Sequence, residues 1–202
     1  MLLVLKDAAL SRLAAFSFAF SAMQMCLAAY LVTYLNTALG YSLLAAGLAL
    51  SVAQAGGVIG RVLWGYVADR WLGAQRMLAI VAAIMAVCAL GTAGLQAGVP
   101  QPLVLALLGA FGASATGWNG VYLAEVARLS PPGMASAATG GSLAITFFGV
   151  VLGPLLFGAI SGAFGSYRAG YIAFAIPVAL SAWQLLRMAQ REPLTPPEGR
   201  PS

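Results

Sequence analysis

The chain alternates between long apolar segments and short connections that hold nearly all of its charged residues. A helix needs about 20 mostly apolar residues to cross a hydrocarbon core of roughly 30 Å, and six uncharged windows are long enough. They cover approximately residues 13–35, 42–64, 77–97, 102–124, 135–161 and 169–187. Because the windows lack the alternating polarity of barrel strands, they predict helices. We therefore expect an all-α membrane protein with six transmembrane helices forming one domain over residues 1–190.

The composition fits a protein that is solvated by lipid. Of its 202 residues, 61% are hydrophobic and only 7% are charged, against roughly a quarter charged in soluble domains. The opening residues lack the pattern of a cleavable signal peptide, so we expect the first helix to act as the insertion signal. The polar, proline-rich residues 191–202 predict a disordered tail.

The basic residues indicate how the helices cross the membrane. With six spans, nearly all Lys and Arg fall on the side that carries both termini, and only Arg168 falls on the other. By the positive-inside rule we expect both termini and residues 65–76 in the cytoplasm, with the helices in a bacterial inner membrane. Contact with anionic lipid accounts for the net charge of +5, so we expect the lipid bilayer and no nucleic acid as a partner.

The residue inventory argues against an enzyme. Without histidine the chain has no Ser-His pair and no histidine metal cluster, and it has no phosphate-binding loop of the type G-x-x-x-x-G-K-[ST]. Cys26 and Cys88 fall inside predicted spans, where free cysteine behaves as a small hydrophobe. We expect no enzymatic activity, no cofactor and no bound metal.

A charged motif follows the second window. It reads G-x-x-x-D-R-x-x-G-x-x-R and is formed by Gly65, Asp69, Arg70, Gly73 and Arg76. This motif resembles the cytoplasmic signature of the major facilitator superfamily, with one residue more than usual between Asp-Arg and the second glycine. The resemblance implies a conformational latch.

We assign Glu125 and Arg128, at the same end of the fourth window, to this latch. Gly65 and Gly73 would let neighbouring backbones approach closely. The alternative is that the charges only orient the connection in the membrane.

The fifth window carries a second motif. Its glycines and proline are spaced like the glycine-proline motif of the fifth helix in many members of that family, antiporters especially. These residues are Gly140, Gly149, Gly153, Pro154 and Gly158. The glycines permit close helix packing, and Pro154 removes a backbone hydrogen bond and should bend the helix. Phe157 stands where the motif often has another glycine.

Together these resemblances cover nearly the whole chain and imply one half of a twelve-helix transporter. The stretch GWNGVYLAEVARLSPPG is similar to the tenth helix of the family, which favours the C-terminal half. The resemblance implies a partner half of six helices, supplied by the same longer chain, a second copy or a separate polypeptide.

Arg61 lies eight residues before Asp69, which places it roughly 12 Å deeper in the membrane if the segment is helical. Gln54 shares its helix face. Arg61 resembles the arginine of the R-x-x-x-G pattern in monocarboxylate transporters, which engages the substrate carboxylate, so the resemblance implies an organic anion. The alternatives are snorkelling to the interface, or an ion pair with Asp69 or Glu125.

Polar residues on the first and fourth windows complete the candidate site. In the resembling family these helices line the central cavity, which makes Gln24, Trp118, Asn119 and Tyr122 candidates for contact with a small-molecule substrate. The alternative is interhelical hydrogen bonding, worth about 0.6 kcal/mol each. We expect secondary active or facilitative transport by alternating access. The alternative function is a non-transporting membrane protein or an inactive, truncated transporter.

Overall fold

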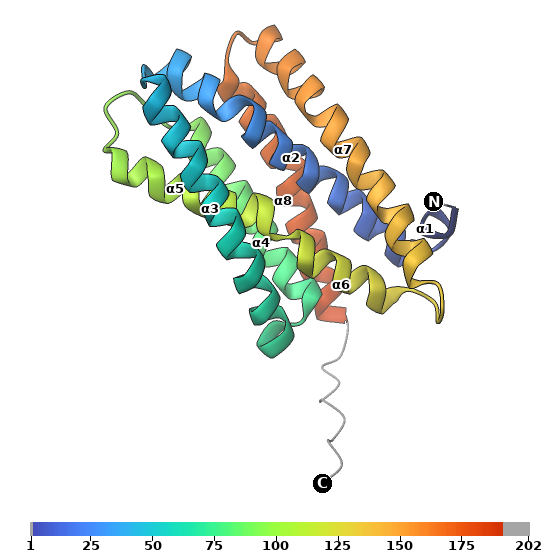
Figure 1. Ribbon diagram of the computed structural model, residues 1–202. Helices are drawn as coiled ribbons and strands as arrows, with labels where there is room; N and C mark the ends of the chain where they lie inside the picture. The colour runs from blue at the N-terminus through green and yellow to red at the C-terminus, as the bar shows by residue number, and fades with distance from the viewer. Residues whose placement is uncertain (1, 192–202) are drawn as a thin grey trace.

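The computed structural model describes residues 2–191, which form helices joined by short turns (Figure 1). Six helical spans in this range are long and apolar enough to cross a membrane, which confirms the predicted fold class. The short helix α1, Leu2–Lys6, precedes them. The spans are α2 Ala8–Leu39, α3 Leu43–Val67 extended by η1 Ala68–Leu72, α4 Ala74–Ala93, α5 Gln101–Gly117 continued by α6 Asn119–Leu129, α7 Ala135–Ala163, and α8 Tyr167–Arg191.

Several of the predicted windows differ from the helices. The first span, Ala8–Leu39, is longer at both ends than the predicted window 13–35. The second span continues beyond residue 64 through the π-helical turn η1. The third ends at Ala93 rather than near residue 97, because a turn rich in Gly and Pro follows it. The fourth is interrupted at Trp118, between α5 and α6. The predicted tail lies outside the described residues from position 192 on, and Arg191 is the last residue of α8.

The turns have identifiable local causes. The carboxylate of Asp7 accepts hydrogen bonds from the backbone N–H groups of Ala9 and Leu10, at 2.9 and 3.0 Å, and so caps the first turn of α2. Gly40 ends α2 with φ +73°, and Gly73 separates η1 from α4 with φ +76°. Residues 65–76 are therefore helical except at Gly73, where the chain changes direction between η1 and α4, and they do not form an open loop.

Helix α2 runs between α3 and α7 and contacts both (Figure 1). Behind it, α4 packs along α8. The spans differ in how much of their most apolar stretch is buried within the bundle. In α4 the buried share is 61%, whereas it is 28% in the span of α3 and 22% in α7. Apolar side chains such as Val62 and Phe147 are consequently exposed on these two helices. The open surface of the bundle is thus formed mainly by α3 and α7.

Helices α3 and α5 pack backbone against backbone. A Cβ added at Gly56 would overlap the carbonyl of Gly109, and one added at Gly112 would overlap that of Ala53. Trp64 fixes the pair by donating its indole N–H to the carbonyl oxygen of Ala113 at 2.8 Å. Small residues allow this approach, since helix association in lipid depends on close packing.

Candidate functional site

Gln24, Trp118 and Asn119 lie together where the fourth span is interrupted. The indole N–H of Trp118 donates to Gln24 Oε1 at 3.2 Å and to the carbonyl oxygen of Ala115 at 3.0 Å. The amide of Asn119 donates to the same Gln24 oxygen at 3.4 Å and to the carbonyl oxygen of Thr116 at 3.2 Å. The side chains after the break thus bond to the last turn of α5 and orient Gln24 from α2.

The two aromatic candidates face the interior. Trp118 is fully buried and Tyr122 is 1% exposed. Trp118 packs edge-on against Phe20 and Tyr122, with ring centroids 5.5 and 5.3 Å apart. The ring of Tyr122 thus packs in the core of the described residues, and its contact with a substrate stays a prediction. Gln24 and Asn119 are partly exposed.

Arg61 and Gln54 lie on the exposed face of α3. A Cβ added at Gly120 would be 4.0 Å from Arg61 Cγ, so the arginine stem runs beside the start of α6. Within residues 2–191, Arg61 forms no ion pair. The alternative in which it pairs with Asp69 or Glu125 is not seen in this structure.

Glu125 bonds to Arg128 and also to Gln75, a residue that was not among the predicted site residues. Although Glu125 is 1% exposed, its carboxylate accepts bonds from Arg128 Nε and a terminal guanidinium nitrogen, both at 2.7 Å, and from Gln75 Nε2 at 2.9 Å. Such a two-point contact stabilises a buried carboxylate. Gln75 lies between Gly73 and Arg76, so its place inside the charged motif was the available signal.

The structure does not bring the rest of the charged motif to this cluster. Asp69 and Arg70 are exposed in η1, and within the described residues neither they nor Arg76 form an ion pair. A Cβ added at Gly65 or Gly73 would meet no atom within 4 Å. The expected close backbone approach at these glycines is therefore not seen in this structure, and Gly73 is required for its positive φ instead.

Four residues of the glycine-proline motif contact α2, namely Gly149, Gly153, Pro154 and Gly158. A Cβ at Gly153 would lie 2.7 Å from Ala22 Cα, and one at Gly158 would lie 2.6 Å from the hydroxyl of Tyr30. That hydroxyl donates to the carbonyl oxygen of Pro154 at 2.9 Å. The motif residues of α7 are thus packed against the first span.

Gly149 and Gly140 differ from each other. A Cβ at Gly149 would overlap Ser21 and Phe18 of α2, whereas one at Gly140 would meet no atom within 4 Å. Gly140 is exposed. Close packing at Gly140 is therefore not seen within the described residues.

Comparisons with known proteins agree with this arrangement. The family model described as Major Facilitator Superfamily matches residues 13–202. The benzoate transport protein of Acinetobacter baylyi is 26% identical over 162 residues, which is 78% of this chain and 34% of that protein.

Solved structures share the fold. The proton:xylose symporter XylE bound to 6-bromo-6-deoxy-D-glucose has a TM-score of 0.70 and 19% identity, over 87% of this chain and 43% of that chain. The partially occluded inward-open form of XylE from E. coli has a TM-score of 0.69 and 18% identity, over 87% and 48%. The chain therefore spans about a third of the length of the curated relative and less than half of each solved chain.

Proposed function

Because the chain belongs to the major facilitator superfamily and is a multi-pass integral membrane protein, we propose that it forms half of a transporter for a small organic anion. The observation that carries this proposal is Arg61, an exposed guanidinium inside a membrane span that has no acidic partner within residues 2–191. A cation at this depth is costly in lipid, so it needs a watery cavity or an anion. Alternating access between two six-helix halves would supply that cavity.

A carboxylate suits Arg61 because the guanidinium fork can donate two parallel hydrogen bonds to it. The curated relative is named a benzoate transport protein, which favours an aromatic carboxylate here as well. Gln54 on the same face of α3, and the amides of Gln24 and Asn119, provide neutral polar contacts for the remainder of the solute. The indole N–H of Trp118 orients the Gln24 side chain by donating a hydrogen bond to its amide oxygen.

We further propose that the motif of Asp69, Arg70 and Arg76 is a latch at the cytoplasmic end, where the positive-inside rule places both termini. The exposed charges of Asp69 and Arg70 are available to a second half, and the bonds from Arg128 and Gln75 to Glu125 fix the neighbouring end of α6. The latch would close the cytoplasmic side in one state and open it in the other. Gly149, Gly153 and Gly158 would keep α2 and α7 together as one body during this motion.

The substrate proposal is tested with Arg61→Lys. Uptake of labelled benzoate is measured in proteoliposomes that hold the chain in its complete assembly, either two copies or one copy with a second six-helix half. Because lysine keeps the charge but loses the fork, KM should rise roughly tenfold. The matched control is Lys6→Gln, which removes an exposed cation outside the site. An unchanged KM in Arg61→Lys would rule out two-point recognition of the carboxylate.

The latch is tested with Asp69→Asn in the same vesicles. Loss of one charge-assisted contact should reduce the maximal uptake rate by about tenfold, while KM stays nearly constant because Asp69 is remote from Arg61. The readout is the initial rate at saturating benzoate. A wild-type rate would mean that the charges only orient the connection.

A further inference from the structure

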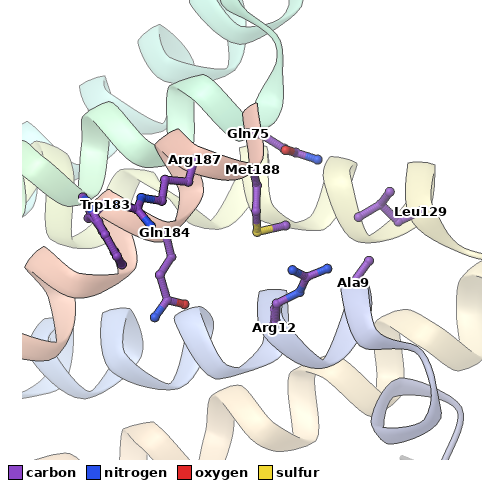
Figure 2. A pocket seen from close by; sticks show the side chains of 8 residues that line it. All are labelled: Ala9, Arg12, Gln75, Leu129, Trp183, Gln184, Arg187 and Met188. Atoms are coloured by element: carbon purple, nitrogen blue, oxygen red, sulfur yellow. The ribbon is translucent and has the colours of Figure 1, made fainter. Parts of the chain in front are cut away.

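A pocket of about 440 Å³ opens at the end of the bundle where α2 begins and α8 ends. Two arginines from different helices line it, Arg12 of α2 and Arg187 of α8 (Figure 2). Gln184 and Met188 of α8 complete its side, and Figure 2 shows Arg12 rising from α2 toward Met188. Arg61 lies on α3, a helix that contributes no residue to this pocket.

Neither arginine is neutralised by an acid within residues 2–191. Arg12 Nε donates to the carbonyl oxygen of Ala8 at 3.0 Å, and the guanidinium carbon of Arg187 lies 3.7 Å above the Trp183 ring centre. The nearby acids have other roles, since Asp7 caps α2 and Glu125 binds Arg128. The pocket therefore holds two positive charges whose remaining N–H donors are available to an anion.

The outer face of α8 carries an apolar stripe that leads to this pocket. Ile172, Ile176, Leu180 and Trp183 recur at helical spacing and are 47–57% exposed, and Arg187 continues the same stripe one turn later. Apolar residues that end in a tryptophan and then an arginine are typical of the boundary between hydrocarbon and headgroups. An acyl chain can thus lie along α8 while its headgroup reaches the pocket.

We propose that this pocket binds the headgroup of an anionic phospholipid. A phosphate diester accepts the paired hydrogen bonds that a guanidinium donates, and basic pockets between transmembrane helices favour such headgroups. The neutral surroundings Gln184 and Met188 suit the glycerol part, and Trp183 suits the start of the acyl chains. This binding site is separate from the proposed transport path and does not depend on it.

The test is native mass spectrometry of the 202-residue chain in detergent, titrated with phosphatidylglycerol and with phosphatidylcholine of the same acyl chains. The wild type should retain one phosphatidylglycerol with at least a tenfold preference. Arg12→Gln and Arg187→Gln should each lower that preference about fivefold, and the double variant should lose it. Met188→Trp keeps both charges but fills the pocket, so it should also lose the preference.

The controls distinguish binding of the lipid in this pocket from a general attraction of anionic lipid to basic side chains. Lys6→Gln removes an exposed cation at the same end and should leave the preference within about twofold, and thermal unfolding without lipid checks that every variant is folded. The proposal is overturned if both lipids bind equally, if Lys6→Gln acts like the arginine variants, or if folded Met188→Trp retains the preference. It is also overturned if millimolar inorganic phosphate displaces the lipid, because the site would then take a free anion.

Discussion

The helix pairs α3–α5 and α2–α7 are both held at glycines, but in different ways. In α3–α5, both helices contribute glycines and the backbones meet directly, as at Gly56 and Gly109. In α2–α7, the close-contact glycines belong to α7, and hydroxyl groups add hydrogen bonds: Thr146 donates to Ser17 Oγ at 2.9 Å, and Ser21 donates to the carbonyl oxygen of Thr146 at 2.8 Å. Both pairs therefore combine close packing with polar contacts. In α3–α5 the polar contact is the single indole bond from Trp64 to the Ala113 carbonyl oxygen, whereas in α2–α7 side-chain hydroxyl groups bond across the helices.

This difference shows how the polar residues of α2 are divided. Ser17 and Ser21 share a helix face with Gln24, yet both serines are buried against α7. Gln24 lies one turn further along, where the interrupted fourth span brings Trp118 and Asn119 to it. Polar residues on the same face of α2 thus have two roles. Ser17 and Ser21 pack against α7, and Gln24 belongs to the candidate site.

The largest effect should come from Gly112→Ala in the α3–α5 pair. The new methyl group would overlap the Ala53 carbonyl group, which belongs to the backbone and cannot rotate away. We expect a loss of about 1–3 kcal/mol in the free energy of unfolding. Titration with a denaturing detergent measures it. Gly47→Ala in α3 is the matched control, since its methyl group meets no atom within 4 Å, and an equal loss there would contradict the packing argument.

Gly153→Ala tests the α2–α7 pair and should have a smaller effect. The added Cβ would lie 2.7 Å from Ala22 Cα and 2.9 Å from both Ala22 Cβ and the Ala22 carbonyl oxygen, a milder overlap than the one at Gly112. We expect roughly 1 kcal/mol of destabilisation in the same titration. Gly140→Ala in α7 is the control and should not be destabilised, because no described atom lies near it. If Gly153→Ala changes the free energy of unfolding no more than that control does, α7 is not closely packed against α2 at Gly153.

Thr146→Val should give the smallest change. It keeps the shape of the side chain but removes the donor to Ser17, and such bonds between transmembrane helices average about 0.6 kcal/mol. The measurement is the shift in the detergent titration midpoint relative to wild type. A loss as large as that of Gly112→Ala would mean that the hydroxyl network, rather than glycine packing, dominates the stability of this pair.

The sequence alone was sufficient to predict the six spans. A segment in lipid must satisfy its own backbone hydrogen bonds, so a long apolar segment forms a helix and can be recognised by its hydropathy. The sequence was not sufficient for the interruption at Trp118, where no proline marks the break, nor for the tertiary contact that Trp118 makes there with Gln24. It also did not predict the bond from Gln75 to Glu125, since a partner 50 residues away is set by how α4 packs near α6. The Arg128–Glu125 pair is different, because residues three apart on one helix are neighbours and the two had been grouped from the sequence.

The glycines that pack closely could also be predicted only in part from the sequence. The motif of α7 stood out because it contains Pro154, whereas Gly56 and Gly112 carry no such marker even though their contacts are at least as close. Tyr122 shared a helix face with polar residues, but its ring faces the core. Helical spacing predicts which residues share a face, and the packing of the other helices decides whether that face is open.

The central claim, that this chain provides the anion-binding half of a transporter, is tested most directly by uptake of labelled benzoate into proteoliposomes containing its complete assembly. The account predicts saturable uptake above that of empty vesicles, which excess unlabelled benzoate abolishes and excess D-xylose leaves unchanged. Uptake indistinguishable from empty vesicles would contradict transport of this anion, and uptake that D-xylose abolishes equally would contradict the role assigned to Arg61.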